Sequence, residues 1–385
     1  MRTDNLKTWV ELDGRALRGN MRVLKKLSAR GKDSSGRGKK LMVMIKCNAY
    51  GHGFAEIARM AGADGADWFA VDNVQEGAEA RRLGIKKPIL VITPTPPALL
   101  GKLLQLNLSQ VVYDTDTLRR MAAFNGKRKF KVHIKIDTGM SRQGIMPYEV
   151  PQYAEKLRAA KNKIIFEGLL THFPDADNLK SRAYTDGQIK KLKEALKIFE
   201  EHGLNPKFVH SANTAGMFTG AGKDFCNLNR IGIGAYGVAP SAGFEKMFAR
   251  AGIRPVLSWK ARILAVKTIP KGAGIGYGVT EKAKRNLRVA VLPVGYYHGV
   301  PRAYSSVGHV LIGGRRCRVV GRVSMNLLVA DISSLRRAPA MWDEAVLIGR
   351  QGKETITANE FAAKCGTIGY EIVTRINPVV QKVIV

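Results

Sequence analysis

Residues 41–53 read LMVMIKCNAYGHG, an apolar run that ends in Lys46 and is followed by a polar, glycine-containing turn. A short apolar run before a turn is typical of a strand buried on both faces. A lysine at the edge of a core is costly unless it is paired or used chemically, and desolvation readily makes its amine a nucleophile or base. The alternative for a lone lysine is an ammonium that snorkels into water.

Seven further apolar runs follow the first, and helical patterns separate them. The runs are WFAVDN (68–73), ILVIT (89–93), QVVYD (110–114), KVHIKID (131–137), FEGLLTHF (166–173), KFVHSAN (207–213) and LNRIGIGAYG (228–237). Eight strand–helix units in succession are the pattern of a TIM (β/α)8 barrel. The sequence therefore predicts an α/β fold that begins with such a barrel.

The pattern of apolar and turn-forming residues changes after about residue 250. Runs such as RVAVLPVGY (288–296) and AVLIGRQG (345–352) alternate with Gly and Pro turns, a pattern typical of β-structure. We expect a barrel over residues 1–245 and a C-terminal β-rich domain over 246–385. The strand-like segment near the N-terminus is a candidate for pairing with the second domain.

Composition predicts a cytoplasmic globular protein. Of the 385 residues 45% are hydrophobic and 24% charged, and no apolar run approaches the roughly 18 residues that span a bilayer. The N-terminus, MRTDNLKTWVELDG, lacks the apolar segment of a secretory signal. The four scattered cysteines form no C-x-x-C pair, which favours reduced thiols over disulfides or a zinc site.

The net charge of +32, from 63 basic and 31 acidic residues, raises the question of a nucleic-acid partner. The basic residues are spread along the whole chain. The densest runs, at 30–40 and 127–131, lack the interleaved aromatic residues of a base-stacking surface. We therefore do not expect a nucleic-acid partner, and nothing in the sequence explains the charge.

Polar residues gather at the ends of the predicted strands, where a TIM barrel carries its active site. They are Lys46, Cys47, Asn48, Asp72, Asn73, Thr93, Asp114, Lys135, Asp137, His172, His210, Ser211, Asn213, Asn229 and Arg230. The small residues of 213–216 and 231–234 offer free backbone N–H groups for a phosphate, and Tyr50 a hydroxyl. A reactive lysine beside a phosphate site in such a barrel indicates pyridoxal phosphate held as a Schiff base.

The sequence strongly resembles the alanine racemase family over nearly its whole length. The motifs that carry the resemblance occur in the family's order at comparable spacing. They are KCNAYGHG, KIDTGMSRQG, THF…AD, HSANTAG, NRIGIGAYG, GIGYG, GYYHGVPR, GRVSMN and GTIGYEI. The resemblance implies interconversion of L- and D-alanine, which supplies D-alanine for peptidoglycan.

The resemblance implies that Lys46 holds the cofactor and acts as base on one face of the substrate, while Tyr277 acts on the other. Two opposed bases allow a proton to leave one side of Cα and another to arrive on the opposite side. A tyrosine with an ordinary pKa of about 10 is a poor base at neutral pH, and the implied partner that lowers it is His172. In the family the second base comes from the other subunit of a head-to-tail homodimer.

The remaining implied roles concern the cofactor ring, the phosphate and the substrate carboxylate. Arg230 would face the pyridine nitrogen and, because arginine keeps its proton, leave that nitrogen unprotonated. Arg142 would steady Tyr277 and the substrate carboxylate, and Lys135 matches a lysine that is often carbamylated. A plain ion pair with Asp137 is the alternative for Lys135. The further implied contacts are Tyr50, Asn213, Thr214, Gly232, Ile233 and Tyr370 for the cofactor and the Met325 backbone for the substrate.

Several positions depart from the family pattern. Asn326 and His298 stand where aspartates are common, Gly369 replaces a usual proline, and Asp175 occupies a place often held by a small residue. Thr214 replaces a common serine but keeps the hydroxyl, so we expect phosphate binding to be retained. Loss of two carboxylates would raise the positive potential near the site entrance. A more positive entrance would favour anionic molecules and leaves substrate preference and turnover open. The nearest alternative is a broader or shifted amino-acid racemase, for example one acting on serine or lysine. A barrel-type decarboxylase would lack both Arg230 and Tyr277.

Overall fold

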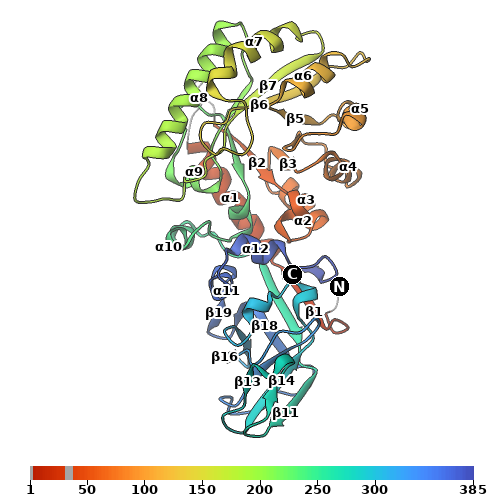
Figure 1. Cartoon of the computed structure of the whole chain (residues 1–385), viewed down its shortest axis with the longest axis vertical. Helices are drawn as coiled ribbons and strands as arrows, with labels where there is room; N and C mark the ends of the chain where they lie inside the picture. Colours follow the sequence, from red (N-terminus) through yellow and green to blue (C-terminus); the bar gives the residue numbers. More distant parts are fainter. Residues whose placement is uncertain (1–2, 31–37) are drawn as a thin grey trace.

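The computed structural model describes residues 3–30 and 38–385, so most of the basic run at 30–40 lies outside the described residues. Figure 1 shows an elongated molecule with the strand–helix units at one end and a strand-rich part at the other. Both termini lie near the middle of the long axis, close to the junction of the two parts (Figure 1).

Eight parallel strands of the described chain form one sheet in the order β8-β7-β6-β5-β4-β3-β2-β9. The strands are β2 (Lys40–Met44), β3 (Trp68–Val71), β4 (Ile89–Val91), β5 (Ser109–Val112), β6 (Phe130–Lys135), β7 (Ile164–Leu170), β8 (Phe208–His210) and β9 (Leu228–Ile231). Each of the eight predicted strands is present, which confirms the TIM barrel.

Single hydrogen bonds close the barrel between β8 and β9. Asn227 N donates to Val209 O over 2.9 Å, and Arg230 N donates to Ala212 O over 3.0 Å. The barrel is therefore nearly closed, and its strand ends meet at one rim.

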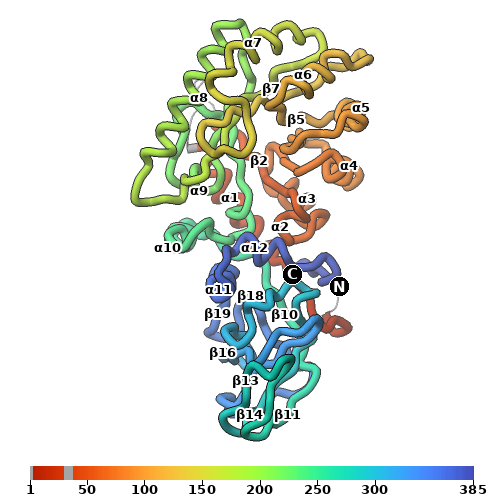
Figure 2. The backbone as a smooth tube through the Cα atoms, viewed as in Figure 1, coloured from red at the N-terminus to blue at the C-terminus, as the bar shows by residue number. Residues whose placement is uncertain are grey.

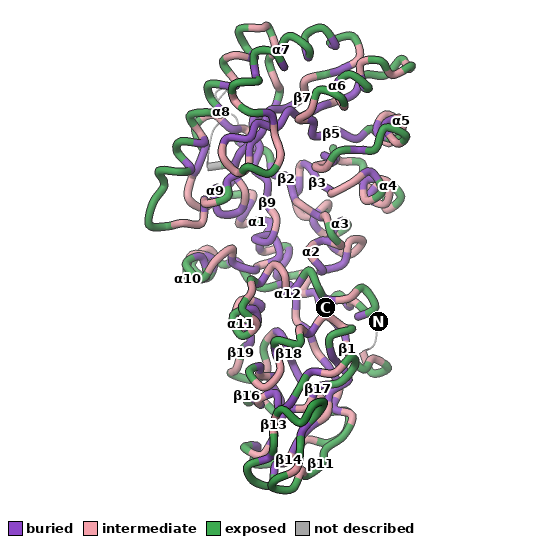
Figure 3. Tube along the Cα trace, in the orientation of Figure 1, coloured by how far each residue is buried: buried purple, intermediate pink, exposed green. Residues whose placement is uncertain are grey.

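Helices lie outside this sheet, with buried faces toward it and exposed faces outward (Figure 3). The helices of this part are α1 (Gly14–Arg30), α2 (Lys46–Tyr50), α3 (Phe54–Ala63), α4 (Val74–Arg82), α5 (Leu100–Gln105), α6 (Thr115–Ala122), α7 (Val150–Ala159), α8 (Ala183–Glu201), α9 (Thr214–Thr219) and α10 (Ala242–Ala251). Several begin at a side-chain cap: Asn73 Oδ1, for example, accepts from Glu76 N over 2.9 Å.

The strand-rich part is built on a long sheet with the order β16-β15-β18-β10-β1-β20. Its strands are β1 (Thr8–Leu12), β10 (Leu257–Arg262), β15 (His309–Ile312), β16 (Arg315–Arg318), β18 (Glu344–Gln351) and β20 (Gln381–Ile384), with β19 (Glu354–Ile356) paired to β18. Smaller sheets contain β11 (Ala265–Ile269), β14 (Leu287–Leu292), β17 (Leu328–Asp331), β12 (Gly274–Ile275) and β13 (Glu281–Lys282). This confirms the predicted strand-rich C-terminal region.

The N-terminal strand β1 lies within the long sheet, antiparallel to β10 and parallel to β20. The chain passes from this sheet into the barrel and back again, and the tube in Figure 2 shows α12 at the crossing region. The predicted boundary between the two domains, at residues 245 and 246, falls inside helix α10. The exact position of this boundary stays a prediction. Within the described residues, none of the helices is both long and apolar enough to cross a bilayer.

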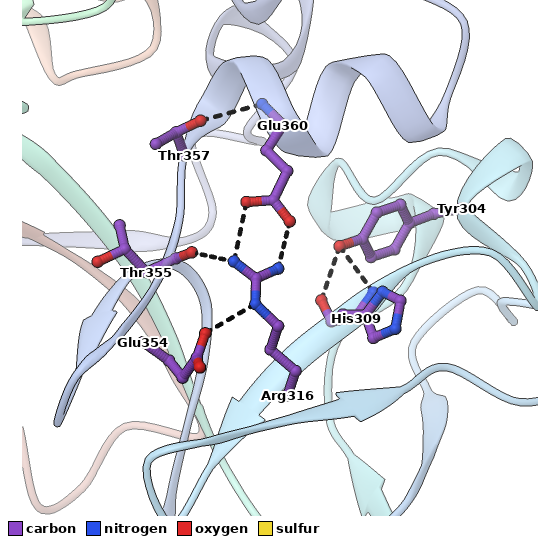
Figure 4. A network of polar contacts seen from close by, with 7 residues as sticks. All are labelled: Tyr304, His309, Arg316, Glu354, Thr355, Thr357 and Glu360. Atoms are coloured by element: carbon purple, nitrogen blue, oxygen red, sulfur yellow. Dashed lines mark hydrogen bonds and ion pairs between the residues drawn. The ribbon is translucent and has the colours of Figure 1, made fainter.

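An arginine-centred network ties β16 to β19 and to α11 (Ala358–Lys364), which precedes α12 (Gly369–Thr374) (Figure 4). The guanidinium of Arg316 donates from Nε to Glu354 over 2.8 Å and from both terminal nitrogens to Glu360. Thr357 caps α11 by accepting from Glu360 N over 3.0 Å. The network thus fixes the segment that leads to α12 and to the functional site.

Candidate functional site

A cavity of about 230 Å³ lies at the carboxyl ends of the barrel strands. It is lined by Met44, Lys46, Tyr50, Ile92, Val111, Lys135, Arg142, Gln143, Leu170, His172, Asn213, Thr214, Arg230, Gly232, Ile233 and Tyr370. The cavity brings together the barrel residues to which the family resemblance gives a role, with Tyr370 from α12. The other polar residues expected at the strand ends do not line it: Cys47, Asn48, Asp72, Asn73, Thr93, Asp114, Asp137, His210, Ser211 and Asn229.

A left-handed turn follows Lys46 directly. Cys47, Asn48, Ala49 and Tyr50 all have φ between 52° and 55°. A left-handed conformation costs roughly 1–2 kcal/mol for each residue other than glycine, so four in succession must be stabilised by their surroundings. The turn places Lys46 and Tyr50 on the wall of the same cavity.

Glu76, in the first turn of α4, stabilises this strained segment. Its carboxylate accepts backbone N–H groups from Cys47 and from Asp72, each over 2.7 Å. Lys46 Nζ in turn lies 3.7 Å from the carboxylate of Asp72. Lys46 is therefore a paired lysine whose backbone is held from the neighbouring strand end, and it is not a side chain that simply snorkels into water.

Arg230 is buried, and its two terminal nitrogens donate only to groups of the barrel rim. NH1 donates to His210 Nδ1 and to His210 O, each over 2.9 Å. NH2 donates to Thr171 O over 2.8 Å, to Ser211 O over 3.0 Å and to His172 Nδ1 over 3.3 Å. Among the described residues Nε has no hydrogen-bond partner, so this N–H is the one that a bound group can engage.

Burial and surrounding positive charge shift the pKa values of the basic residues in the cavity. Burial, with Arg230 next in effect, lowers the pKa of His172 to about 3, so this imidazole is neutral. Burial and the nearby Arg142 and Arg230 lower the pKa of Lys135 to about 8. Burial also lowers the pKa of Arg230 to about 10, which leaves its guanidinium charged at neutral pH.

Asp137 organises the loop that carries Arg142. Its carboxylate accepts backbone N–H groups from Gly139, Ser141 and Arg142 over 3.0, 2.9 and 3.0 Å. Within residues 3–30 and 38–385 no ion pair joins Asp137 to Lys135; instead Lys135 Nζ donates to Gln143 Oε1 over 3.3 Å. The backbone of the loop takes up the Asp137 carboxylate, although its charge still acts on Lys135 against the larger effects of burial and of Arg142 and Arg230. The choice between a carbamate on Lys135 and an ion pair with Asp137 therefore stays a prediction.

Two of the expected site residues lie outside the cavity. Tyr277 is 72% exposed and Met325 54% exposed, both in the strand-rich part of the chain. Gly276 and Gly278, with φ of 73° and 71°, flank Tyr277 and allow the turn that presents it. Within one copy of the chain, the cavity therefore contains Lys46 but not the second proposed base.

The cavity fits a phosphorylated cofactor. Four cationic side chains line it, and none of the lining residues, all of which are described, is acidic. Gly232 leaves space in the wall, since a Cβ there would lie 2.7 Å from Tyr50 Oη. Gly234 does not line the cavity but makes room for the lining residue Thr214, because a Cβ on Gly234 would lie 2.4 Å from Thr214 Cγ2. A positive cavity with hydroxyls at a glycine-rich wall is suited to a phosphate dianion.

Of the departures from the family pattern, Thr214 lines the cavity, and the other four lie outside its wall. Asn326 is exposed, and His298 Nδ1 accepts from Gly295 N over 3.2 Å. Asp175 accepts from Asn178 Nδ2 over 3.1 Å. A Cβ on Gly369 would lie 2.2 Å from Asn359 Oδ1, so Asn359 takes the space that a larger residue would need.

Sequence reasoning assigned no role to Glu76 or Gln143. Gln143 follows Arg142 directly in the motif that carries the resemblance. Its position next to Arg142 is therefore the sequence feature from which its place in the site could have been predicted. Glu76 stands three residues after Asn73, in the first turn of α4. Acidic residues are common in the first turn of a helix because they interact favourably with its dipole, so nothing in the sequence marks this one as special. Its contact with Cys47 is set by the adjacency of β2 and β3.

Two family profiles match the chain over almost all of its length. The profile described as "Alanine racemase, N-terminal domain" covers residues 12–240, and "Alanine racemase, C-terminal domain" covers residues 256–384. The chain belongs to the alanine racemase family. This confirms the resemblance and identifies the protein as an isomerase of the racemase class.

Relatives and solved structures agree with this assignment to the alanine racemase family. The alanine racemase of Methylacidiphilum infernorum is 37% identical over 98% of this chain and 92% of its own, and that of Symbiobacterium thermophilum is 38% identical over 96% and 95%. The structure of alanine racemase from Bacillus anthracis with bound L-Ala-P has a TM-score of 0.90 at 32% identity, covering 98% of this chain and 95% of its own. That of Streptomyces lavendulae has a TM-score of 0.89 at 30% identity, covering 98% and 97%.

Proposed function

We propose that the protein interconverts L- and D-alanine with pyridoxal phosphate bound to Lys46, in a site completed by a second copy of the chain. The observation that carries the proposal is the cavity at the barrel rim, where Lys46 and three further cations meet a glycine-cut wall. Bound cofactor would supply an electron sink that acidifies the α-proton of the amino acid. The four free cysteines fit a reducing cytosol, where the product would serve peptidoglycan synthesis.

The described residues assign a part to each wall of the cavity. Lys46 would hold the cofactor covalently through Nζ. Tyr50, Asn213, Thr214, Gly232, Ile233 and Tyr370 would surround its phosphate end. Arg230 would donate from Nε to the ring nitrogen, and because a guanidinium does not release its proton, that nitrogen would stay unprotonated. The cofactor ring would then be a weaker electron acceptor, which disfavours side reactions such as transamination.

Lys46 and Tyr277 of the partner subunit would exchange protons with opposite faces of Cα. Arg230 donates to Nδ1 of the neutral His172, so the proton of this imidazole lies on Nε2. An N–H donor at that position would stabilise the phenolate of Tyr277 and make it a usable base. Arg142 and the backbone of Met325 would hold the substrate carboxylate.

The surface around Tyr277 supports a second copy as the missing component. Exposed apolar side chains gather on adjacent loops there: Val279, Tyr296, Tyr297, Met325 and Leu327. The loops are in contact, since Tyr297 N donates to Met325 O over 3.0 Å and a Cβ on Gly276 would lie 3.3 Å from Arg322 N. A contiguous exposed apolar patch is typical of a protein interface. In a head-to-tail dimer each such patch would face the other copy's barrel rim.

We further propose that Lys135 carries a carbamate that pairs with Arg142. The neutral Nζ would attack the carbon of CO2, forming an N–C bond while one proton leaves to solvent. The depressed pKa of about 8 supports this reaction because only the neutral amine is nucleophilic. The product would be an anion beside Arg142, in a cavity whose other charged side chains are all cations.

A subunit-mixing experiment tests the shared site. Lys46→Ala should lose the visible absorption band of bound cofactor and all racemisation, whereas Tyr277→Phe should keep the band and lose most activity. Neither variant alone forms an intact site. After dissociation and reassociation of an equal mixture, half of the dimers would be mixed and each would hold one intact site, restoring about a quarter of wild-type activity. Failure to regain activity, with mixed dimers demonstrated by differential tagging, would refute the shared site.

A further inference from the structure

A line of buried polar side chains runs from Arg230 across the barrel interior and away from the cavity. His210 Nε2 lies 2.8 Å from His133 Nδ1, and His133 Nε2 lies 3.3 Å from Glu167 Oε2. Ser109 Oγ donates to the same oxygen of Glu167. Both imidazoles are completely buried, so these contacts are not shared with bulk water.

Donor and acceptor capacity fixes the direction of every hydrogen bond in this line. Arginine only donates, so Nδ1 of His210 must accept and its proton must lie on Nε2. That N–H donates to His133 Nδ1, which places the proton of His133 on Nε2 as well. The carboxylate of Glu167 only accepts, so it receives this last N–H. The guanidinium at one end and the carboxylate at the other therefore require the same pair of tautomers.

A β-bulge in β7 makes this arrangement possible. Val132 of β6 pairs with Phe166, and the next residue, His133, pairs with Gly168, so Glu167 is the extra residue. Bulges re-aim side chains and occur next to active sites. Gly168 supplies the space, since a Cβ there would lie 2.3 Å from His133 Nδ1. Strand register and a glycine thus both serve the contact between His133 and Glu167.

The two ends of the line are electrically complementary. Burial lowers the pKa of both His133 and His210, so each stays neutral between the two charged ends. Burial would raise the pKa of Glu167, but hydrogen bonds from His133 and Ser109 lower it, so it is ionised. Hydrogen bonds aligned head to tail between a cation and an anion reinforce one another.

We infer that His133 and Glu167 are positioning residues that hold Arg230 in place through His210, by fixing both imidazoles as Nε2–H tautomers. The effect on the cofactor ring rests on the proposed function, because Arg230 would contact that ring through Nε. The tautomers themselves do not depend on it. Glu167 thereby acts on the site through two imidazoles without lining the cavity.

The test is ¹⁵N NMR of the cofactor-loaded protein labelled in its histidine rings, with signals assigned through His133→Gln and His210→Gln. We expect acceptor-type Nδ1 and protonated Nε2 in both residues of the wild type. Glu167→Gln is the matched control, since its amide oxygen can still accept and should preserve both tautomers. Glu167→Leu removes the acceptor and leaves the Nε2–H of His133 buried without a partner. Because Arg230 still fixes the tautomer of His210, both Nε2–H forms should persist, but the Nε2–H signal of His133 should lose its hydrogen-bonded shift and pyridoxal phosphate should dissociate about tenfold faster.

An Nδ1–H tautomer at either residue in the wild type would overturn the inference, whatever the variants do. So would a folded Glu167→Leu protein with a wild-type Nε2–H shift at His133 and a wild-type rate of cofactor release, which would indicate that Glu167 serves packing alone. The proposed function fails separately, if the wild-type protein neither binds the cofactor nor racemises alanine.

Discussion

The carbamate on Lys135 can be tested quantitatively because the pKa sets how much reactive amine exists. With a pKa of about 8, roughly 10% of the Nζ groups are neutral at pH 7, whereas an unshifted lysine near 10.5 would have about 0.03%. The site therefore presents about 300 times more neutral amine than an exposed lysine. Below pH 8 the neutral fraction falls tenfold for each unit of pH, so carbamate formation should weaken as the pH decreases.

The perturbation is Lys135→Arg, which keeps the positive charge but cannot react with CO2. An anion beside Arg142 makes a charge-assisted hydrogen bond of roughly 1.5–3 kcal/mol, so its loss should lower kcat/KM about 10- to 100-fold. Lys131→Arg, on the same strand, is the control: Lys131 Nζ donates to Asn107 Oδ1 over 2.9 Å and does not line the cavity.

The assay is ¹³C NMR of protein equilibrated with ¹³C-bicarbonate at pH 7.0 to 9.0, together with racemisation rates. We expect a carbamate resonance in the wild type and in Lys131→Arg that strengthens toward higher pH and is missing in Lys135→Arg. Absence of that resonance from the wild type at pH 9.0 in saturating bicarbonate would refute the reasoning.

Two further substitutions probe the bases and the cofactor site. Tyr277→Phe should lower the conversion of L-alanine far more than the solvent exchange of the D-alanine α-proton, because Lys46 still serves one face of the substrate. ¹H NMR in D2O measures both rates. Equal loss of the two would contradict the assignment of one base to each face. Gly232→Ala should weaken pyridoxal phosphate binding about tenfold or more, because its Cβ would lie 2.7 Å from Tyr50 Oη. Equilibrium dialysis measures this, and unchanged affinity would show that Tyr50 can move without loss.

Much of the fold could be predicted from the chain alone because buried parallel strands leave a direct trace in sequence. Each of the eight apolar runs became a barrel strand, and their polar ends met at one rim, as the common direction of parallel strands requires. Lys46, Arg230 and His172 could thus be grouped before any coordinates, and the family motifs added the roles of residues far apart in the chain.

The register between strands and the close approaches between side chains of different strands leave no such pattern in the sequence. Three features depend on which strands are neighbours and on the offset between them. They are the bulge at Glu167, the space left by Gly168, and the hydrogen bond from Cys47 N, in the turn after Lys46, to Glu76. The pKa values of Lys135 and His172 arise from burial and from charges brought in by other strands. Sequence therefore determined which chemical groups reach the rim, because alternating buried strands and helices form a parallel barrel whose strand ends meet at one rim. Only the tertiary structure decided their partners and protonation, because those depend on distances across the barrel.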